Sequence, residues 1–223
     1  MLLYYCLPIT SQCWGIKEDN LFSLISSERK DKIKNYHHTI DKKLSLYAEL
    51  LTRIGLSHMS GLPISSIQFS YSSNGKPFWK GYPYYFNFSH TKNFILCCIS
   101  NLGNIGADVE KIDIAPFEIM KIVFHPSEIR YIQNAPIAKK NYYFYKIWTQ
   151  KESYTKFTGT GIIEDLRKIN VLDPVYSPYF YTWLQDDYLC SVYSERPEKH
   201  QLVHISEDDV MYHCKFLLNP SFN

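Results

Sequence analysis

The sequence lacks three features that would each point to a class of function: a large net charge, a long apolar run and patterned cysteines. Lysine and arginine number 24 against 22 aspartates and glutamates, so the formal net charge is only +2. Such a balanced charge makes no electrostatic case for nucleic acid as a partner. No apolar run is long enough to span a bilayer. No basic residue precedes the apolar opening 1–6, so we expect a strand there and no secretion signal.

The six cysteines show no spacing typical of a metal site. Cys97 and Cys98 are adjacent within an apolar segment, and the others are scattered along the chain. Free cysteine behaves as a small apolar residue that is easily buried. We therefore expect reduced, mostly buried thiols in a cytoplasmic protein, and no zinc site.

What the sequence does have is the composition of an ordinary globular protein, with 45% apolar and 21% charged residues over 223 positions. That length can bury one large core or two smaller ones. Apolar spacing predicts helices at 21–36, 41–60, 116–134 and 139–157, and strands at 67–71, 86–90, 94–100, 105–110, 179–184 and 188–193. Each half of the chain thus has helices and strands, so the predicted fold class is α+β.

Two short segments carry most of the chemical information. Trp148, Glu152 and Lys156 are spaced four apart, so on a helix they lie along one face. About forty residues earlier, Asp108 and Glu110 alternate within an apolar run, and on a strand they point the same way. Three converging carboxylates and a lysine are typical of a divalent cation that holds a phosphorylated substrate.

Each segment also has a simpler explanation. A glutamate and a lysine one turn apart are usually a solvated pair that contributes only about a few tenths of a kcal/mol. An Asp-x-Glu sequence often marks a polar strand edge or the start of a turn. The combination is harder to explain in this way, because Asp108 and Glu110 follow Gly106 in an apolar strand, where unpaired carboxylates would be unfavourable. A buried cation would satisfy them.

Taken in order, four motifs of this chain resemble those of the 4'-phosphopantetheinyl transferases. They are Gly75-Lys76-Pro77, Phe86-Asn87-Phe88-Ser89-His90, Gly106-Ala107-Asp108-Val109-Glu110, and Trp148-x-x-Lys151-Glu152-Ser153-x-x-Lys156 followed by Gly159-Thr160-Gly161. Chain length and the upstream motifs are similar to those of the longer, surfactin-synthetase-activating class. The resemblance implies two similar α/β lobes related by a pseudo-twofold axis, with the site between them. Residues 1–103 would form an N-terminal lobe that contacts coenzyme A, and residues 104–223 a C-terminal lobe with the magnesium site and the catalytic helix.

The resemblance also implies the reaction. The serine hydroxyl of an apo acyl or peptidyl carrier protein attacks the β-phosphorus of coenzyme A, receives the 4'-phosphopantetheine arm and releases 3',5'-ADP. Mg²⁺ is the expected ion, and Mn²⁺ can substitute. We expect no nucleic-acid or membrane partner and a monomer, since one chain would contain both lobes. The carrier is expected to dock on an apolar surface near 117–124.

Site roles follow from the same resemblance. Asp108, Glu110 and Glu152 are the expected metal ligands. Glu152 would also take the proton from the carrier serine, with Glu110 as the rival base. Lys156 would face the pyrophosphate and stabilise the departing ADP, and Lys151 would lie at the rim of the phosphate site.

The remaining expected contacts are with coenzyme A. The resemblance places His90 at the 3'-phosphate and Ser89 at a neighbouring phosphate, and it places Lys76 and Pro77 beside the nucleotide. Gly75 lets the backbone of that turn come close to the ligand. A basic segment supplies either a solvated helix face or further phosphate contacts, and its cations are Arg29, Lys30, Lys32, Lys34, Lys42 and Lys43. From this region the expected ligand contacts are Arg29, Lys32 and Ser45.

For some residues, and for the function, the sequence allows a second interpretation. Glu128 matches a further family acid or is simply an exposed acid at a helix start. Gly159 ends a helix or, with Gly161, forms a phosphate loop. Lys42 and Lys43 stand where many relatives have arginine, so point charges replace bidentate guanidinium groups there. The alternative functions are another Mg²⁺-dependent nucleotide or pyrophosphate hydrolase, and a non-catalytic coenzyme A binder.

Overall fold

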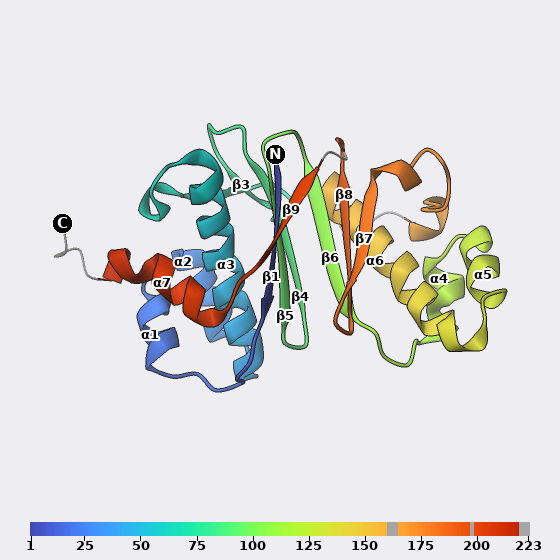
Figure 1. Cartoon of the computed structure of the whole chain (residues 1–223), viewed down its shortest axis with the longest axis horizontal. Coiled ribbons are helices and arrows are strands. Elements are labelled where there is room, and N and C mark those ends of the chain that lie inside the picture. Colours follow the sequence, from blue (N-terminus) through green and yellow to red (C-terminus); the bar gives the residue numbers. More distant parts are fainter. Residues whose placement is uncertain (160–164, 197–198, 219–223) are drawn as a thin grey trace.

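The computed structural model describes residues 1–159, 165–196 and 199–218. Two sheets stand face to face at its centre, and helices cover the outer face of each sheet (Figure 1). The order of layers is therefore helices, sheet, sheet, helices. The predicted α+β class is confirmed, with two lobes that each consist of a sheet and its helices.

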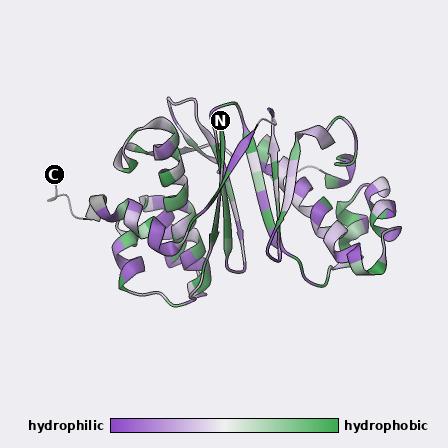
Figure 2. Cartoon of the chain, viewed as in Figure 1, coloured by the Kyte–Doolittle hydropathy of each residue, from purple (hydrophilic) through white to green (hydrophobic). Residues whose placement is uncertain are grey.

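The N-terminal lobe is built on a four-stranded sheet of order β4-β5-β1-β9. Its strands are β1 (Leu2–Pro8), β4 (Tyr85–Thr91), β5 (Phe94–Ser100) and β9 (His200–His204). Successive side chains of a strand point to opposite faces. Tyr5 of β1 therefore packs under the helices, whereas Tyr4 packs against the second sheet. Because both faces of β1 and β5 are covered, these strands are almost entirely hydrophobic (Figure 2).

The helices over this sheet are α1 (Ile16–Phe22), α2 (Ser27–Lys34), α3 (Thr39–Ser60) and α7 (Glu207–Leu218). The prediction of a single helix at 21–36 is wrong, because a non-helical segment separates α1 from α2. Ser26 begins α2 by accepting a hydrogen bond from the Arg29 N–H at 3.2 Å, as a serine at a helix N-cap does. The helix predicted at 41–60 is confirmed and begins two residues earlier.

The C-terminal lobe is built on β6 (Ile105–Lys111), β7 (Phe180–Gln185) and β8 (Tyr188–Ser194), in the order β6-β8-β7. α6 (Lys140–Thr158) crosses this sheet, and α4 (Met120–Val123) and α5 (Pro126–Gln133) lie beyond it (Figure 1). Gly159 ends α6 with φ 72°, the left-handed conformation that glycine adopts easily. The helix-end explanation of Gly159 is therefore correct, while Thr160 and Gly161 lie outside the described residues.

Gly106 allows α6 to lie directly on β6. A Cβ atom at this position would lie 2.0 Å from the carbonyl oxygen of Ser153 and 2.4 Å from the nitrogen of Phe157. Any side chain would therefore push the helix away from the strand. The two acidic segments singled out in the sequence meet at this contact.

The last described segment returns to the N-terminal lobe. β9 pairs with β1, and Glu207 at the start of α7 lies 2.7 Å from Lys43 Nζ in α3. Lys43 also pairs with Glu18 at 3.2 Å and is 2% exposed, so it is neither solvated nor directed at a ligand. The C-terminal lobe expected at 104–223 therefore does not contain β9 and α7, which complete the N-terminal sheet and its helical layer. The boundary near 103 stays a prediction.

The remaining elements are short. β2 (Phe69–Tyr71) and β3 (Pro77–Trp79) form an antiparallel hairpin, and single turns of 3₁₀ helix occur at Ile64–Ser66, Phe117–Ile119, Ile137–Lys139, Leu166–Lys168 and Ser177–Tyr179. All six cysteines are free, and Cys13 alone among them is exposed, as expected. Within the described ranges, no helix is both long enough and apolar enough to cross a membrane.

Candidate active site between the lobes

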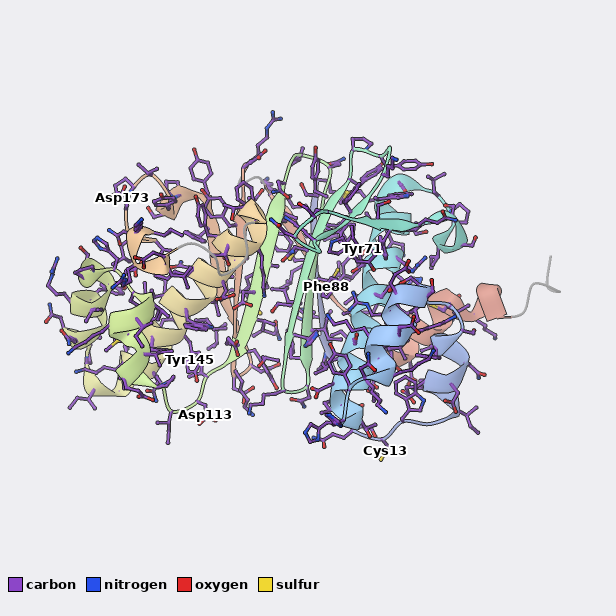
Figure 3. The ribbon with its side chains drawn as sticks, turned by 180° about the vertical axis from the view of Figure 1, so that it is seen from behind. Cys13, Tyr71, Phe88, Asp113, Tyr145 and Asp173 are labelled. Carbon is purple, nitrogen blue, oxygen red and sulfur yellow. The ribbon has the colours of Figure 1, made fainter. Side chains whose placement is uncertain are left out.

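The sheets of the two lobes pack through their apolar faces, and at one side of this contact side chains join the edge strands β4 and β6. The hydrogen bonds that cross are Asn87 Oδ1 with the Ala107 N–H (2.9 Å), Ser89 Oγ with Asp108 Oδ1 (2.8 Å) and Thr91 Oγ1 with Glu110 Oε2 (3.0 Å). We call the line formed by these six residues the seam. In Figure 3, Phe88 marks β4 at the middle of the molecule, and Tyr145 marks α6 on the C-terminal side of it.

Helix α6 brings a cation to the seam. Lys156 Nζ lies 2.6 Å from Asp108 Oδ1 and donates a hydrogen bond to Ser89 Oγ at 2.9 Å. One ammonium group of α6 therefore contacts both β6 and β4. The Lys156 side chain is 31% exposed, so a ligand can still reach it.

Asp108 has an unsatisfied oxygen. Its Oδ2 is buried and has no hydrogen-bond partner among the described residues. A buried, unpaired carboxylate oxygen is unfavourable and usually indicates a missing ion, water or ligand. Its neighbours Glu110 and Glu152 also carry carboxylates, and hard oxygen donors of this kind suit Mg²⁺.

The carboxylates do not form a finished metal shell. Among residues 1–159, 165–196 and 199–218, no three acidic, imidazole or thiol groups stand close enough to enclose a cation. Mg²⁺ commonly binds through one or two carboxylates and completes its shell with water or substrate phosphates. The donor set therefore fits the ion, and the three-ligand site of Asp108, Glu110 and Glu152 stays a prediction.

The two glutamates of the site hold protons more tightly than usual. Burial raises the pKa of Glu110 to about 7, and the Asp108 carboxylate adds to the rise, while the Thr91 hydrogen bond opposes it. Burial also raises the pKa of Glu152, with a further rise from Asp108 and an opposing effect of Lys156. An acid whose pKa lies near 7 can accept a proton at neutral pH, as a general base must.

Cations gather around His90 at the same seam. Burial, together with the charges of Lys156, Arg29 and Lys32, lowers the pKa of His90 to about 4, while the charge of Asp41 opposes the shift. The imidazole is therefore neutral at pH 7 in surroundings that favour an anion. Three cations around one neutral imidazole suit the phosphate that the sequence predicts there.

Arg29 of α2 and Ser45 of α3 lie on the helical side of β4. The Arg29 guanidinium stands over the Phe88 ring at 5.3 Å, lies 3.4 Å from Glu49 and donates to Ser45 Oγ at 3.2 Å. Ser45 is 0% exposed. The expectation that Ser45 contacts the ligand is therefore wrong for this arrangement, because its hydroxyl is buried and orients Arg29. Lys32 is exposed beside them.

A groove opens beside the seam with a volume of about 350 Å³. Its lining residues are Asn74, Gly75, Lys76, Pro77, Asn87, Phe88, Glu152, Thr155, Lys156 and Gly159. Lys76 and Pro77 thus lie in the same groove as the catalytic candidates Glu152 and Lys156. Burial lowers the pKa of Lys76 to about 8.

Lys151 is not part of this groove. Its Nζ lies 2.9 Å from Glu128 Oε2, with side-chain exposures of 1% and 0%, and it also donates to the carbonyls of Leu166 and Ile169. The expectation that Lys151 lies at the rim of the phosphate site is therefore wrong, because its ammonium is enclosed in the core of the C-terminal lobe. The alternative that Glu128 is an exposed acid is wrong for the same reason.

Three residues of the site were not predicted from the sequence. Thr91 holds Glu110, and Asn74 and Asn104 contact the end of α6. Strand alternation was a usable signal for Thr91, because it lies two residues after Ser89 and so on the same face of β4. No sequence signal indicated the two asparagines, since the contact of Asn74 depends on how the lobes dock and that of Asn104 on how α6 lies against β6.

Two family models together match most of this chain. A family model described as the 4'-phosphopantetheinyl transferase superfamily matches residues 104–205, and one described as 4'-phosphopantetheinyl transferase, N-terminal, matches residues 15–101. A 4'-phosphopantetheinyl transferase of Bacillus subtilis is 30% identical over 156 residues, which are 70% of this chain and 69% of the relative. The transferase gsp of Aneurinibacillus migulanus is 33% identical over 64% of this chain and 59% of its own length. The transferase Sfp of Bacillus subtilis strain 168 is 29% identical over 76% and 74%.

The resemblance noted in the sequence is therefore confirmed at the level of the superfamily. Both lobes are covered by matches, and the two acidic motifs fall within the superfamily match. This chain belongs to the 4'-phosphopantetheinyl transferase superfamily.

Proposed function

We propose that the protein transfers the 4'-phosphopantetheine arm of coenzyme A to a serine of apo acyl or peptidyl carrier proteins, as a member of the longer, surfactin-synthetase-activating class. The observation that carries the proposal is the seam itself. There Lys156 of α6 contacts Asp108 of β6 and Ser89 of β4, beside a buried carboxylate oxygen that has no hydrogen-bond partner in the part of the chain that the structure describes.

In the proposed reaction, the serine oxygen bonds to the β-phosphorus, the bond from that phosphorus to the ADP oxygen breaks, and 3',5'-ADP leaves. Lys156 faces the pyrophosphate and neutralises the charge that develops on the leaving oxygens. Glu152 takes the serine proton, with Glu110 as the rival base. The raised pKa of both acids supports this role.

Asp108, Glu110 and Glu152 are the residues that would hold Mg²⁺ or Mn²⁺. When bound, the ion neutralises the phosphate oxygens of coenzyme A and so lowers the barrier to attack. His90, Arg29 and Lys32 would hold the 3'-phosphate, and the positive charges of Lys156, Arg29 and Lys32 lower the pKa of the imidazole, which supports an anion beside it.

The carrier is proposed to dock near 117–124, on the C-terminal side of the seam. Ile114 is 85% exposed and Ile122 is 70% exposed, so this part of the surface offers large apolar side chains. The choice of this surface rests on the resemblance to the family, and the two isoleucines are apolar side chains that a carrier docked there would cover. The monomeric state and the cytoplasmic location stay predictions.

The test is to incubate the protein with coenzyme A, Mg²⁺ and an apo carrier protein, and to weigh the carrier by mass spectrometry. The proposal predicts a mass gain of one phosphopantetheine arm, together with release of 3',5'-ADP. Cleavage of coenzyme A without a mass gain would indicate the hydrolase instead. Bound but intact coenzyme A would indicate the non-catalytic binder. A panel of acyl and peptidyl carriers would then rank the natural partners.

A further inference from the structure

The C-terminal end of α6 is held by side chains from outside the helix. Lys76, in the turn between β2 and β3, donates to the carbonyl of Lys156 at 2.7 Å and to that of Phe157 at 3.2 Å. Asn74 of the same turn donates to the carbonyl of Gly159 at 2.9 Å. The last carbonyls of a helix have no partner within it. The N-terminal lobe therefore supplies the partners for this helix of the C-terminal lobe.

Asn104 completes the junction. It is the residue before β6, its Oδ1 accepts a hydrogen bond from Lys76 Nζ at 3.1 Å, and its Nδ2 donates to the carbonyl of Phe157. A primary amide can accept and donate at the same time. Asn104 thus binds the lysine and the helix end to each other, which neither a carboxylate nor an ammonium could do alone.

The junction fixes Lys156 at both of its ends. Its carbonyl is bound by Lys76, and its ammonium lies 2.6 Å from Asp108 and 2.9 Å from Ser89. Gly106 sets how closely α6 approaches β6, whereas the junction opposes sliding of α6 along its own axis. A slide of about 1 Å would lengthen the contacts of Lys156 beyond hydrogen-bond range, and misplacement on this scale can lower a rate by about 10²-fold.

We propose that Asn104 is a positioning residue for the transfer reaction, acting through Lys76 and Phe157 on the reach of Lys156. The inference rests on the proposed function for its kinetic part only. The position of the helix end is a property of the fold and can be measured without any reaction.

The experiment compares Asn104→Ala, which removes both contacts, with Asn104→Asp, which keeps the acceptor for Lys76 and loses the donor to Phe157. Asn101→Ala is the matched control, because Asn101 lies in the same turn, is exposed, and contacts the Met1 nitrogen. Each protein is assayed for kcat and KM with coenzyme A, Mg²⁺ and an apo carrier. Hydrogen–deuterium exchange is followed in the peptide that covers 150–159.

We expect kcat of Asn104→Ala to fall about tenfold to a hundredfold, with KM for coenzyme A changed by less than about twofold, because placement rather than binding is lost. Asn104→Asp should lose less, and Asn101→Ala nothing. Hydrogen exchange at the end of α6 should be fastest in Asn104→Ala, slower in Asn104→Asp and unchanged in Asn101→Ala.

Wild-type kcat in both Asn104 variants would overturn the inference, and so would a loss of kcat without any change in exchange at 150–159. If Asn104→Ala does not fold, Asn104→Asp decides by the same two readouts. A wild-type protein that transfers nothing would refute the proposed function, and the exchange measurement would still decide whether Asn104 holds α6.

Discussion

Lys151 and Lys156 lie five residues apart on α6, and both pair with a carboxylate, yet their surroundings differ. Lys151 Nζ is 2.9 Å from Glu128 in the core of the C-terminal lobe, with 1% exposure. Lys156 Nζ is 2.6 Å from Asp108 at the seam, with 31% exposure. Both ion pairs lie within the C-terminal lobe, but Lys156 also donates a hydrogen bond to Ser89 of β4 and so contacts the N-terminal lobe.

The difference lies in how the three donors of each ammonium are used. Glu128 and the carbonyls of Leu166 and Ile169 take all three donors of Lys151. The described contacts of Lys156, to Ser89 and Asp108, take two. Lys151 therefore has no donor left for a phosphate, whereas Lys156 lines the groove, is 31% exposed and uses two of its three donors in these contacts. Lys151 stabilises the core of the C-terminal lobe, and Lys156 is available to the candidate active site.

Among the variants that test the difference between Lys151 and Lys156, Glu152→Ala should cause the largest loss of kcat, because it removes the acid beside Lys156. Loss of a general base lowers kcat by about 10²–10⁴-fold. The fold should stay intact, since burial already disfavours this carboxylate, as its raised pKa shows. Carrier mass assays and thermal unfolding measure the two quantities. Retained turnover would exclude both roles of Glu152, as base and as metal ligand.

Lys151→Met should affect stability instead of chemistry. It leaves Glu128 buried without its partner, and breaking a buried ion pair in this way costs about 3–5 kcal/mol of unfolding free energy. In the protein that remains folded, turnover per molecule should match the wild type. Urea unfolding measures the loss of unfolding free energy, and single-turnover assays on the folded fraction measure the turnover per molecule. A Lys151→Met protein that is stable but inactive would show that Lys151 acts in the reaction.

The pH dependence of that variant sharpens the same point. Burial raises the pKa of Glu128 although Lys151 opposes the rise, so removal of Lys151 raises it further. A carboxyl whose pKa is higher in the folded state stabilises the fold at low pH and ceases to do so as the pH rises through that pKa. The stability deficit of Lys151→Met should thus be smaller at pH 5.5 than at pH 8. Equal deficits at the two pH values would contradict a buried Glu128.

Lys156→Ala should lower kcat by about 10²–10³-fold, the usual effect of removing one stabilising group at a developing charge. Its stability should fall less than that of Lys151→Met, because the Lys156 side chain is 31% exposed and its removal lets water reach Asp108, whereas Lys151 and Glu128 are both enclosed. Lys139→Ala, an exposed lysine just before α6, is the control. The account fails if Lys156→Ala loses stability and keeps its rate.

Lys76, a third lysine in contact with α6, should show the smallest effect. Burial lowers its pKa to about 8, so between pH 8 and its unfolded value the unfolded chain binds more protons than the folded one. Wild-type stability should therefore rise relative to Lys76→Met over this range, by no more than about 1.4 kcal/mol per pH unit. Urea unfolding of both proteins at pH 7.5 and 9.5 checks the sign. A falling difference would mean that Lys76 stays charged.

The sequence predicted what depends on local periodicity. Alternation placed Asp108 and Glu110 on one face of β6, and a spacing of four placed Glu152 and Lys156 on one face of α6. It did not predict which lysine of α6 is buried, because that depends on Glu128 arriving from α5. Likewise, no local pattern indicated that β9 returns to pair with β1, since parallel pairing joins residues about two hundred positions apart.

The most direct test of the account is a crystal of the protein with Mn²⁺ and coenzyme A, analysed by anomalous diffraction. The account predicts a manganese peak at the seam, in contact with Asp108 Oδ2 and with carboxylate oxygens of Glu110 and Glu152, and with the pyrophosphate beside Lys156. Coenzyme A bound elsewhere, or a seam without a manganese peak while its acids face solvent, would contradict it.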